Sequence, residues 1–124
     1  MSNTEMTQNT SGMGEKSIVP PTVMNQFNWG AFLCTWIWGI ANKTYITLII
    51  LIAGFIPFMS LILSIWFGFK GNEWAWRNKR FESEAAFHEY QIFWVKISLI
   101  FIGVMIFVSL IIAAMVFAIV MHND

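Results

Sequence analysis

Residues 92–121, IFWVKISLIFIGVMIFVSLIIAAMVFAIVM, contain one charged side chain, Lys96, and no other ionisable group. Because an α-helix rises about 1.5 Å per residue, this stretch exceeds the roughly 30 Å hydrocarbon core of a bilayer. We therefore predict a transmembrane helix over residues 92–121. Lys96 lies near its start, where a long side chain extends its ammonium group to the membrane surface.

Residues 45–69 form a second long run without charge. Their length predicts a second transmembrane helix. Pro57 lacks an amide donor and clashes with the preceding turn, so we expect a kink just before it. The alternative is a turn at residues 54–57 between two half-helices. Each half is too short to cross alone, so we favour the kink, although pairing with residues 27–41 would support the turn.

Residues 27–41, FNWGAFLCTWIWGIA, are apolar but too short to span the membrane. We expect an interfacial or re-entrant helix, with Trp29, Trp36 and Trp38 at the headgroup boundary, where indole is favoured. Cys34 is the only cysteine, which excludes a disulfide within the chain, and its apolar surroundings predict a buried small side chain.

The composition predicts an all-α integral membrane protein. Hydrophobic residues make up 57% of the chain and charged residues only 11%, against a usual charged share of about a quarter. Residues 1–26 are the polar exception, and their composition predicts a flexible tail. Residues 27–124 are expected to form a single membrane domain.

Residues 70–91 lie between the two predicted spans and hold most of the charged residues of the chain. Acidic and basic side chains four residues apart favour an amphipathic surface helix. Because glutamates surround its basic cluster, anionic lipid headgroups are the expected contact and nucleic acid is not. The predicted interface anchors in this loop are Trp74, Trp76, Arg77, Lys79 and Arg80.

Counting lysine and arginine places this loop in the cytoplasm, because the C-terminal tail carries neither. The predicted protein is therefore multi-pass with its C-terminus outside. The N-terminal tail is outside if residues 27–41 do not cross, and inside if they do.

Small residues recur along both predicted spans. Ser60, Ser64 and Gly68 are four residues apart, so they share one helix face, and Ser109 and Ala113 have the same spacing. Such faces let a second helix approach closely. They indicate either a partner-helix site or packing between the chain's own spans, which we favour.

The sequence contains no recognisable set of catalytic residues. The predicted spans hold no deep ionisable group, which argues against a pump acting alone. Glu84 and His88, four residues apart, and Glu89 offer a few metal-ligand types, but a single histidine is a weak signal and a solvated helix face is favoured. We predict no enzyme activity, cofactor or metal.

Three phrases resemble a group of small bacterial membrane proteins: residues 27–32 (FNWGAF), 36–39 (WIWG) and 71–78 (GNEWAWRN). That family's shared domain opens with an Asn-Trp-x-Ala-Phe motif and has no assigned activity. The resemblance covers residues 27–93 and implies a bacterial plasma membrane and an ordered Trp-rich segment. Some relatives carry an N-terminal zinc ribbon, which this chain lacks.

Together these observations favour a non-enzymatic accessory or interaction protein. It would dock on a membrane partner or on a second copy of itself, with the lipid bilayer as its other contact. The alternative hypothesis is an immunity or transport-linked protein that acts against a membrane-active peptide or for a small molecule.

Overall fold

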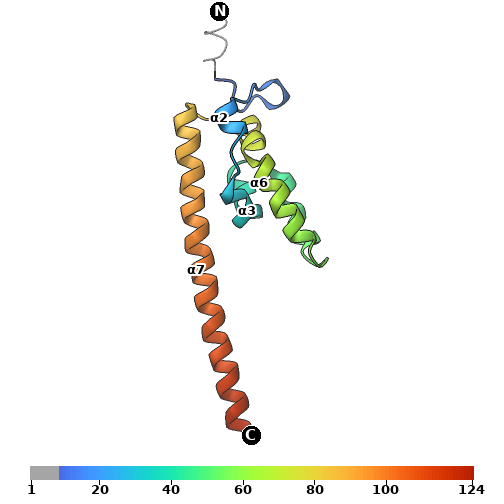
Figure 1. Ribbon diagram of the computed structural model, residues 1–124, viewed down its shortest axis with the longest axis vertical. Helices are drawn as coiled ribbons and strands as arrows, with labels where there is room; N and C mark the ends of the chain where they lie inside the picture. Colours follow the sequence, from blue (N-terminus) through green and yellow to red (C-terminus); the bar gives the residue numbers. More distant parts are fainter. Residues whose placement is uncertain (1–8) are drawn as a thin grey trace, which may run out of the picture.

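The computed structural model describes residues 9–124, and every regular element in that range is helical. The all-α prediction is confirmed. In chain order the elements are η1 (Gly14–Lys16), α2 (Pro21–Met24), α3 (Trp29–Leu33), α4 (Thr35–Ala41), η2 (Tyr45–Ile49), α5 (Ile50–Ala53), α6 (Met59–Asn78) and α7 (Glu84–Asn123). The shorter elements gather with α6 beside the first part of α7, and we call residues 9–83 the N-terminal module (Figure 1).

Helix α7 contains the predicted span over residues 92–121. It is 40 residues long, and its most apolar window has a mean hydropathy of 3.0 with no residue buried in the protein. Its lower part extends well past the module (Figure 1), and its side chains are exposed. Within residues 9–124 it is the one helix long and apolar enough to cross a membrane. The expectation of two such helices is therefore not supported.

Residues 45–69 form a hairpin instead of one kinked helix. Helix α5 ends at Ala53, the chain reverses, and α6 begins at Met59. Phe58 adopts the left-handed conformation, with φ of +65°, at the turn. The preference for a kink was wrong, and the half-helix alternative describes this segment.

The reversal has a local cause and a tertiary cause. Pro57 supplies no amide donor and disfavours helical geometry at the residue before it, so helix propagation is weakest at this point. The two legs of the hairpin then pack against α4, which lies next to both η2 and α6. Residues 27–41 thus provide the packing partner that each short leg lacks alone.

Residues 70–91 consist mostly of the last part of α6 and the first part of α7. Helix α6 continues to Asn78, and α7 starts at Glu84 with Ser83 as its N-cap, whose hydroxyl accepts from the amide of Ala86 at 3.0 Å. The expected helical character is confirmed, but the connecting loop is only residues 79–83. A serine N-cap of this kind satisfies one of the free amides in the first turn.

Residues 9–26 are packed on the rest of the module, contrary to the expectation of a flexible tail. The amide of Gly12 donates to the carbonyl of Trp76, and the Ser11 hydroxyl both accepts from the amide of Phe81 and donates to its carbonyl. Thr10, Ser11 and Ser17 are buried. A polar composition alone does not make a segment disordered when hydrogen-bond partners lie next to it. Here the end of α6 and the residues after it provide such partners. Residues 1–8 lie outside the described range.

This packing also changes the expected topology. Because residues 9–20 touch the end of α6, the N-terminal segment and residues 79–83 lie on the same side of the protein. An N-terminal segment outside with the loop inside, expected if residues 27–41 do not cross, is incompatible with these contacts.

The core of the module is aromatic and lies between α3, α4, α6 and the first turns of α7. Trp38 and Phe87 are fully buried, and the rings of Trp76 and Phe81 stack with centroids 6.2 Å apart. The prediction of Trp38 and Trp76 as interface anchors is therefore wrong, because neither ring reaches the surface. Cys34 is buried as expected, with 5% of its surface exposed.

Candidate functional site

A network of buried side-chain amides joins α3, α4, α6 and α7. Its centre is Gln91, whose Oε1 accepts from Asn28 Nδ2 at 2.9 Å and from Trp38 Nε1 at 2.8 Å. Its Nε2 donates to Asn42 Oδ1 at 2.9 Å. Asn28 Nδ2 also donates to Asn72 Oδ1 at 2.7 Å. All five side chains are buried, so each bond replaces water that these groups have lost.

Asn28 connects this network to the backbone on both sides. Its Oδ1 accepts from the backbone amide of Ala31 at 2.9 Å, and this bond caps α3. The backbone amide of Asn28 donates to the carbonyl of Gly68 at 2.7 Å. Asn72 Nδ2 donates to the carbonyl of Gln26 at 2.9 Å. The start of α3 is thereby fixed against the middle of α6.

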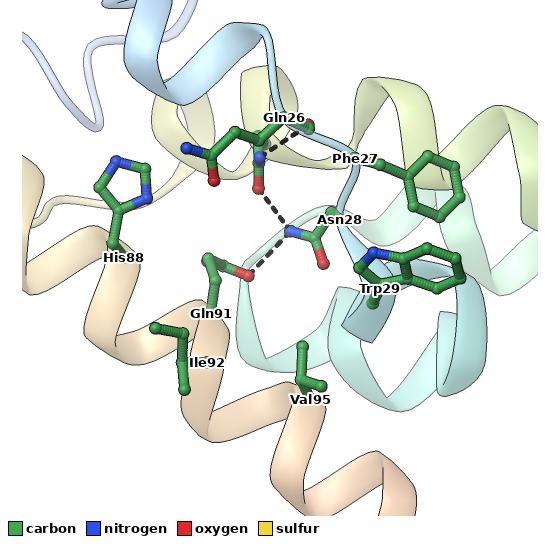
Figure 2. A pocket seen from close by; sticks show the side chains of 9 residues that line it. Gln26, Phe27, Asn28, Trp29, His88, Gln91, Ile92 and Val95 are labelled. Atoms are coloured by element: carbon green, nitrogen blue, oxygen red, sulfur yellow. Dashed lines mark hydrogen bonds between the residues drawn. The ribbon is translucent and has the colours of Figure 1, made fainter.

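A pocket of about 340 Å³ opens beside the network (Figure 2). Gln26, Asn28, Asn72, His88 and Gln91 supply its polar wall, whereas the remaining lining is apolar and comes from Phe27, Trp29, Ile92 and Val95. His88 and Gln91 project from successive turns of α7, and Ile92 and Val95 follow further along the same helix (Figure 2). The pocket is thus polar toward the start of α7 and apolar further along that helix.

The chemistry of this site is that of neutral hydrogen bonding. Amide groups donate and accept without carrying charge, and His88 adds an imidazole, which can also donate and accept hydrogen bonds. No group of three histidine, cysteine or acidic side chains in residues 9–124 is placed to hold a metal ion. Glu84 accepts from the hydroxyl of Thr22 at 3.1 Å, away from the pocket, so the structure does not gather Glu84 and Glu89 around His88.

The small residues of α6 pack within the chain. A β-carbon on Gly68 would overlap the ring of Phe27, and Ser64 Oγ lies 3.4 Å from Thr35 Oγ1. This face therefore receives α3 and α4, which agrees with packing inside the chain, although the expected partner was the other span. Ser60 is half-buried near the hairpin turn.

On α7 the small residues have no such cover. Ser109 and Ala113 are exposed, and Ser109 shares a shallow apolar groove with Leu33 of α3. Because the helix turns about 100° per residue, Ser109 lies on the same side as buried Ser98. The face that contacts the module therefore continues, bare, into the lower half of α7.

The predicted interface anchors divide into three groups. Trp29 and Trp36 are exposed, Trp74 is half-buried against Trp66, and Lys96 is exposed on α7. The other basic residues contact the protein itself. Arg77 donates to the carbonyls of Glu15 and Ser17 at 3.3 Å, Arg80 to that of Asn9 at 2.9 Å, and Lys79 lies 5.2 Å from the centre of the Tyr90 ring.

The amide network was not predicted, yet its signal is present in the sequence. Asn28, Trp38 and Asn72 each lie in one of the three phrases quoted in the sequence analysis, and Gln91 ends the charged segment. The amide of Asn28 lies in the otherwise apolar phrase FNWGAF, and such a group indicates a buried hydrogen-bond partner, because an unpaired amide there is costly. The spacing of these residues along the chain does not show that they meet.

In comparisons with known proteins, no family model matches the chain, and neither a curated protein nor a solved structure is significantly similar to it.

Proposed function

We propose that this protein is a non-enzymatic interaction protein of the membrane, in which α7 spans the bilayer and holds the N-terminal module at its cytoplasmic surface. The bare lower half of α7 carries the proposal, because it is apolar on all sides and its side chains are exposed. Lipid or a partner helix must cover this surface, and the small residues favour a helix on one side of it.

The charge distribution supports this orientation. All lysines and arginines precede the uncharged part of α7, and His122, Asn123 and Asp124 follow it. Lysine and arginine are retained on the cytoplasmic side of membranes. The module, including residues 9–26, is therefore proposed to be cytoplasmic with the C-terminus outside.

The docking face is proposed to be the continuation of the module-contacting side of α7, around Ser109 and Ala113. A partner helix placed there would lie below α3 and would approach the backbone of α7 closely, because both side chains are small. The partner is a transmembrane helix of another protein or of a second copy of this chain. Ile111 and Ala114 point away from this face, since each is turned by about 100° or more from it.

Photo-crosslinking in native membranes tests this proposal. A photoreactive residue at Ser109 is expected to give a discrete protein adduct, whereas the same residue at Ile111 gives lipid adducts only. The substitutions Ala113→Leu and Ala114→Leu form a matched pair, of which only the first should remove the adduct at position 109. Lipid adducts alone at both positions would refute docking on this face.

A further inference from the structure

The hairpin over residues 45–69 exposes an apolar tip. Ile52, Phe55 and Phe58 have 75%, 88% and 78% of their surfaces exposed, and the outer faces of both legs are also apolar. Soluble proteins rarely expose apolar patches of this extent, since each Å² in water costs about 25 cal/mol. Residues 9–124 leave the tip uncovered, so it needs a cover from outside this part of the chain.

Several backbone amides of the turn are bonded within the turn itself. The amides of Gly54, Phe55 and Ile56 donate to the carbonyls of residues 50, 52 and 53, and the amide of Met59 donates to that of Ile56. Pro57 has no amide to satisfy. Because an unpaired amide in hydrocarbon costs several kcal/mol, these four internal bonds lower the cost of placing the turn in lipid.

The extent of the hairpin along α6 can be compared with that of α7, because the amide network joins the two helices at one level. Asn28 bonds to both Asn72 of α6 and Gln91 of α7, so these two residues lie at the same height. At about 1.5 Å per residue, Met59 is about 20 Å along α6 from this level, whereas Met121 is about 45 Å along α7. The hairpin thus ends far short of the lower end of α7, as Figure 1 shows.

The lysines mark where hydrocarbon begins. Lys70 of α6 and Lys96 of α7 are both exposed and both lie just below the amide level. Below Lys70 the uncharged part of α6 is about 16 Å long, about half of a hydrocarbon core, and below Lys96 that of α7 is about 37 Å. One element therefore has the length to reach the middle of the bilayer and the other the length to cross it.

We propose that the η2–α5–α6 hairpin inserts into the leaflet on the module's side and stops near the middle of the bilayer, so that the protein is a one-leaflet wedge. The acyl chains of that leaflet cover its tip. Several helices then occupy the near leaflet, whereas α7 alone occupies the far one. Such unequal area favours membranes in which the near leaflet is convex, since shallow insertion is sensitive to curvature.

This proposal depends on α7 being in the membrane but not on a docking partner. The full-length protein with Cys34→Ala is reconstituted in vesicles of phosphatidylcholine and phosphatidylglycerol, and single cysteines are introduced for labelling. Nitroxide labels attached at Phe55→Cys and Ile106→Cys should both collide with oxygen, which dissolves in hydrocarbon. Neither label should collide with a nickel complex that stays in water. Ile106 is the reference, because it lies about 15 Å below Lys96 on α7.

Sidedness separates a hairpin from a crossing helix. Tyr45→Cys and Glu82→Cys should react with an impermeant thiol reagent from the same side of the vesicle. Reaction from opposite sides would mean that residues 45–69 cross, which overturns the wedge. A nickel-accessible label at position 55 beside a protected one at 106 also overturns it, whereas accessible labels at both positions remove the membrane location itself.

Curvature preference is tested through orientation. In small unilamellar vesicles, a larger share of Glu82→Cys should face outward than in large ones, because the outer leaflet of a small vesicle is convex. Phe55→Lys places a charge at the tip and should abolish this difference, whereas Met13→Lys, at an exposed position of the N-terminal segment, should retain it. An orientation ratio independent of vesicle size would refute the wedge.

Discussion

Replacing Gln91 with leucine removes the centre of the amide network without a large change in volume. Trp38 Nε1 and Asn42 Oδ1 then lose their partners, while Asn28 Nδ2 keeps its bond to Asn72. Each orphaned buried group costs about 1–3 kcal/mol, so two of them cost about 2–6 kcal/mol. Leucine regains part of this as a buried apolar side chain, and we expect Gln91→Leu to lower the free energy of unfolding by about 2–4 kcal/mol.

Unfolding of the purified protein in mixed micelles, titrated with a denaturing detergent and followed by tryptophan fluorescence, measures this loss. The matched control is Glu89→Leu, which introduces the same residue at an exposed position of α7 and should change stability by no more than about 0.5 kcal/mol. If Gln91→Leu and Glu89→Leu unfold at the same detergent fraction, the network does not stabilise the module.

A double-mutant cycle with Trp38→Phe isolates the indole hydrogen bond. Phenylalanine has no N–H to orphan, so the penalty for Gln91→Leu should shrink by about 1–3 kcal/mol in the Trp38→Phe background. Additive effects would mean that the 2.8 Å contact between Trp38 and Gln91 contributes nothing measurable.

Two further predictions concern close packing and the N-terminal segment. Gly68→Ala should destabilise the module by about 1–3 kcal/mol, because its β-carbon overlaps the ring of Phe27, whereas Gly103→Ala meets no neighbour and should be neutral or stabilising in the same titration. Equal effects of both would exclude the tight contact. Arg77→Ala should release the carbonyls around Lys16 and speed tryptic cleavage there, as a time course followed by mass spectrometry would show, and unchanged cleavage would refute this role.

Hydropathy predicted correctly those elements whose structure depends only on their own composition. Residues 92–121 lie within α7 because a long apolar run favours a helix, which pairs its own backbone groups. Cys34 is buried because the residues around it are apolar. Residues 45–69 show where this reasoning ends: their apolar character is the same in a straight helix and in a hairpin. The choice between the two depends on α4, which lies beside both legs and cannot be placed by hydropathy.

The packing of the N-terminal segment and the amide network could not be predicted from the sequence for a related reason. Serine, threonine and asparagine are as compatible with a solvated tail as with a buried hydrogen bond. Ser11 is buried because the backbone of Phe81, 70 residues away, supplies both its donor and its acceptor. Contacts of this kind are specific to the fold, and no periodicity in the sequence reports them.

The position of the amide network explains how a short hairpin can be held at a fixed depth. Two helices of unequal length, both apolar in their lower parts, can slide along each other in lipid at little cost, since hydrocarbon does not distinguish one register from the next. Asn28, Asn72 and Gln91 remove this freedom, because sliding α6 by one turn would separate groups that are paired within 2.9 Å. The register they fix places Lys70 and Lys96 at similar heights and leaves the side chains in the lower half of α7 exposed. The proposed wedge and the proposed docking face both depend on this polar layer, so we expect loss of Gln91 to alter both.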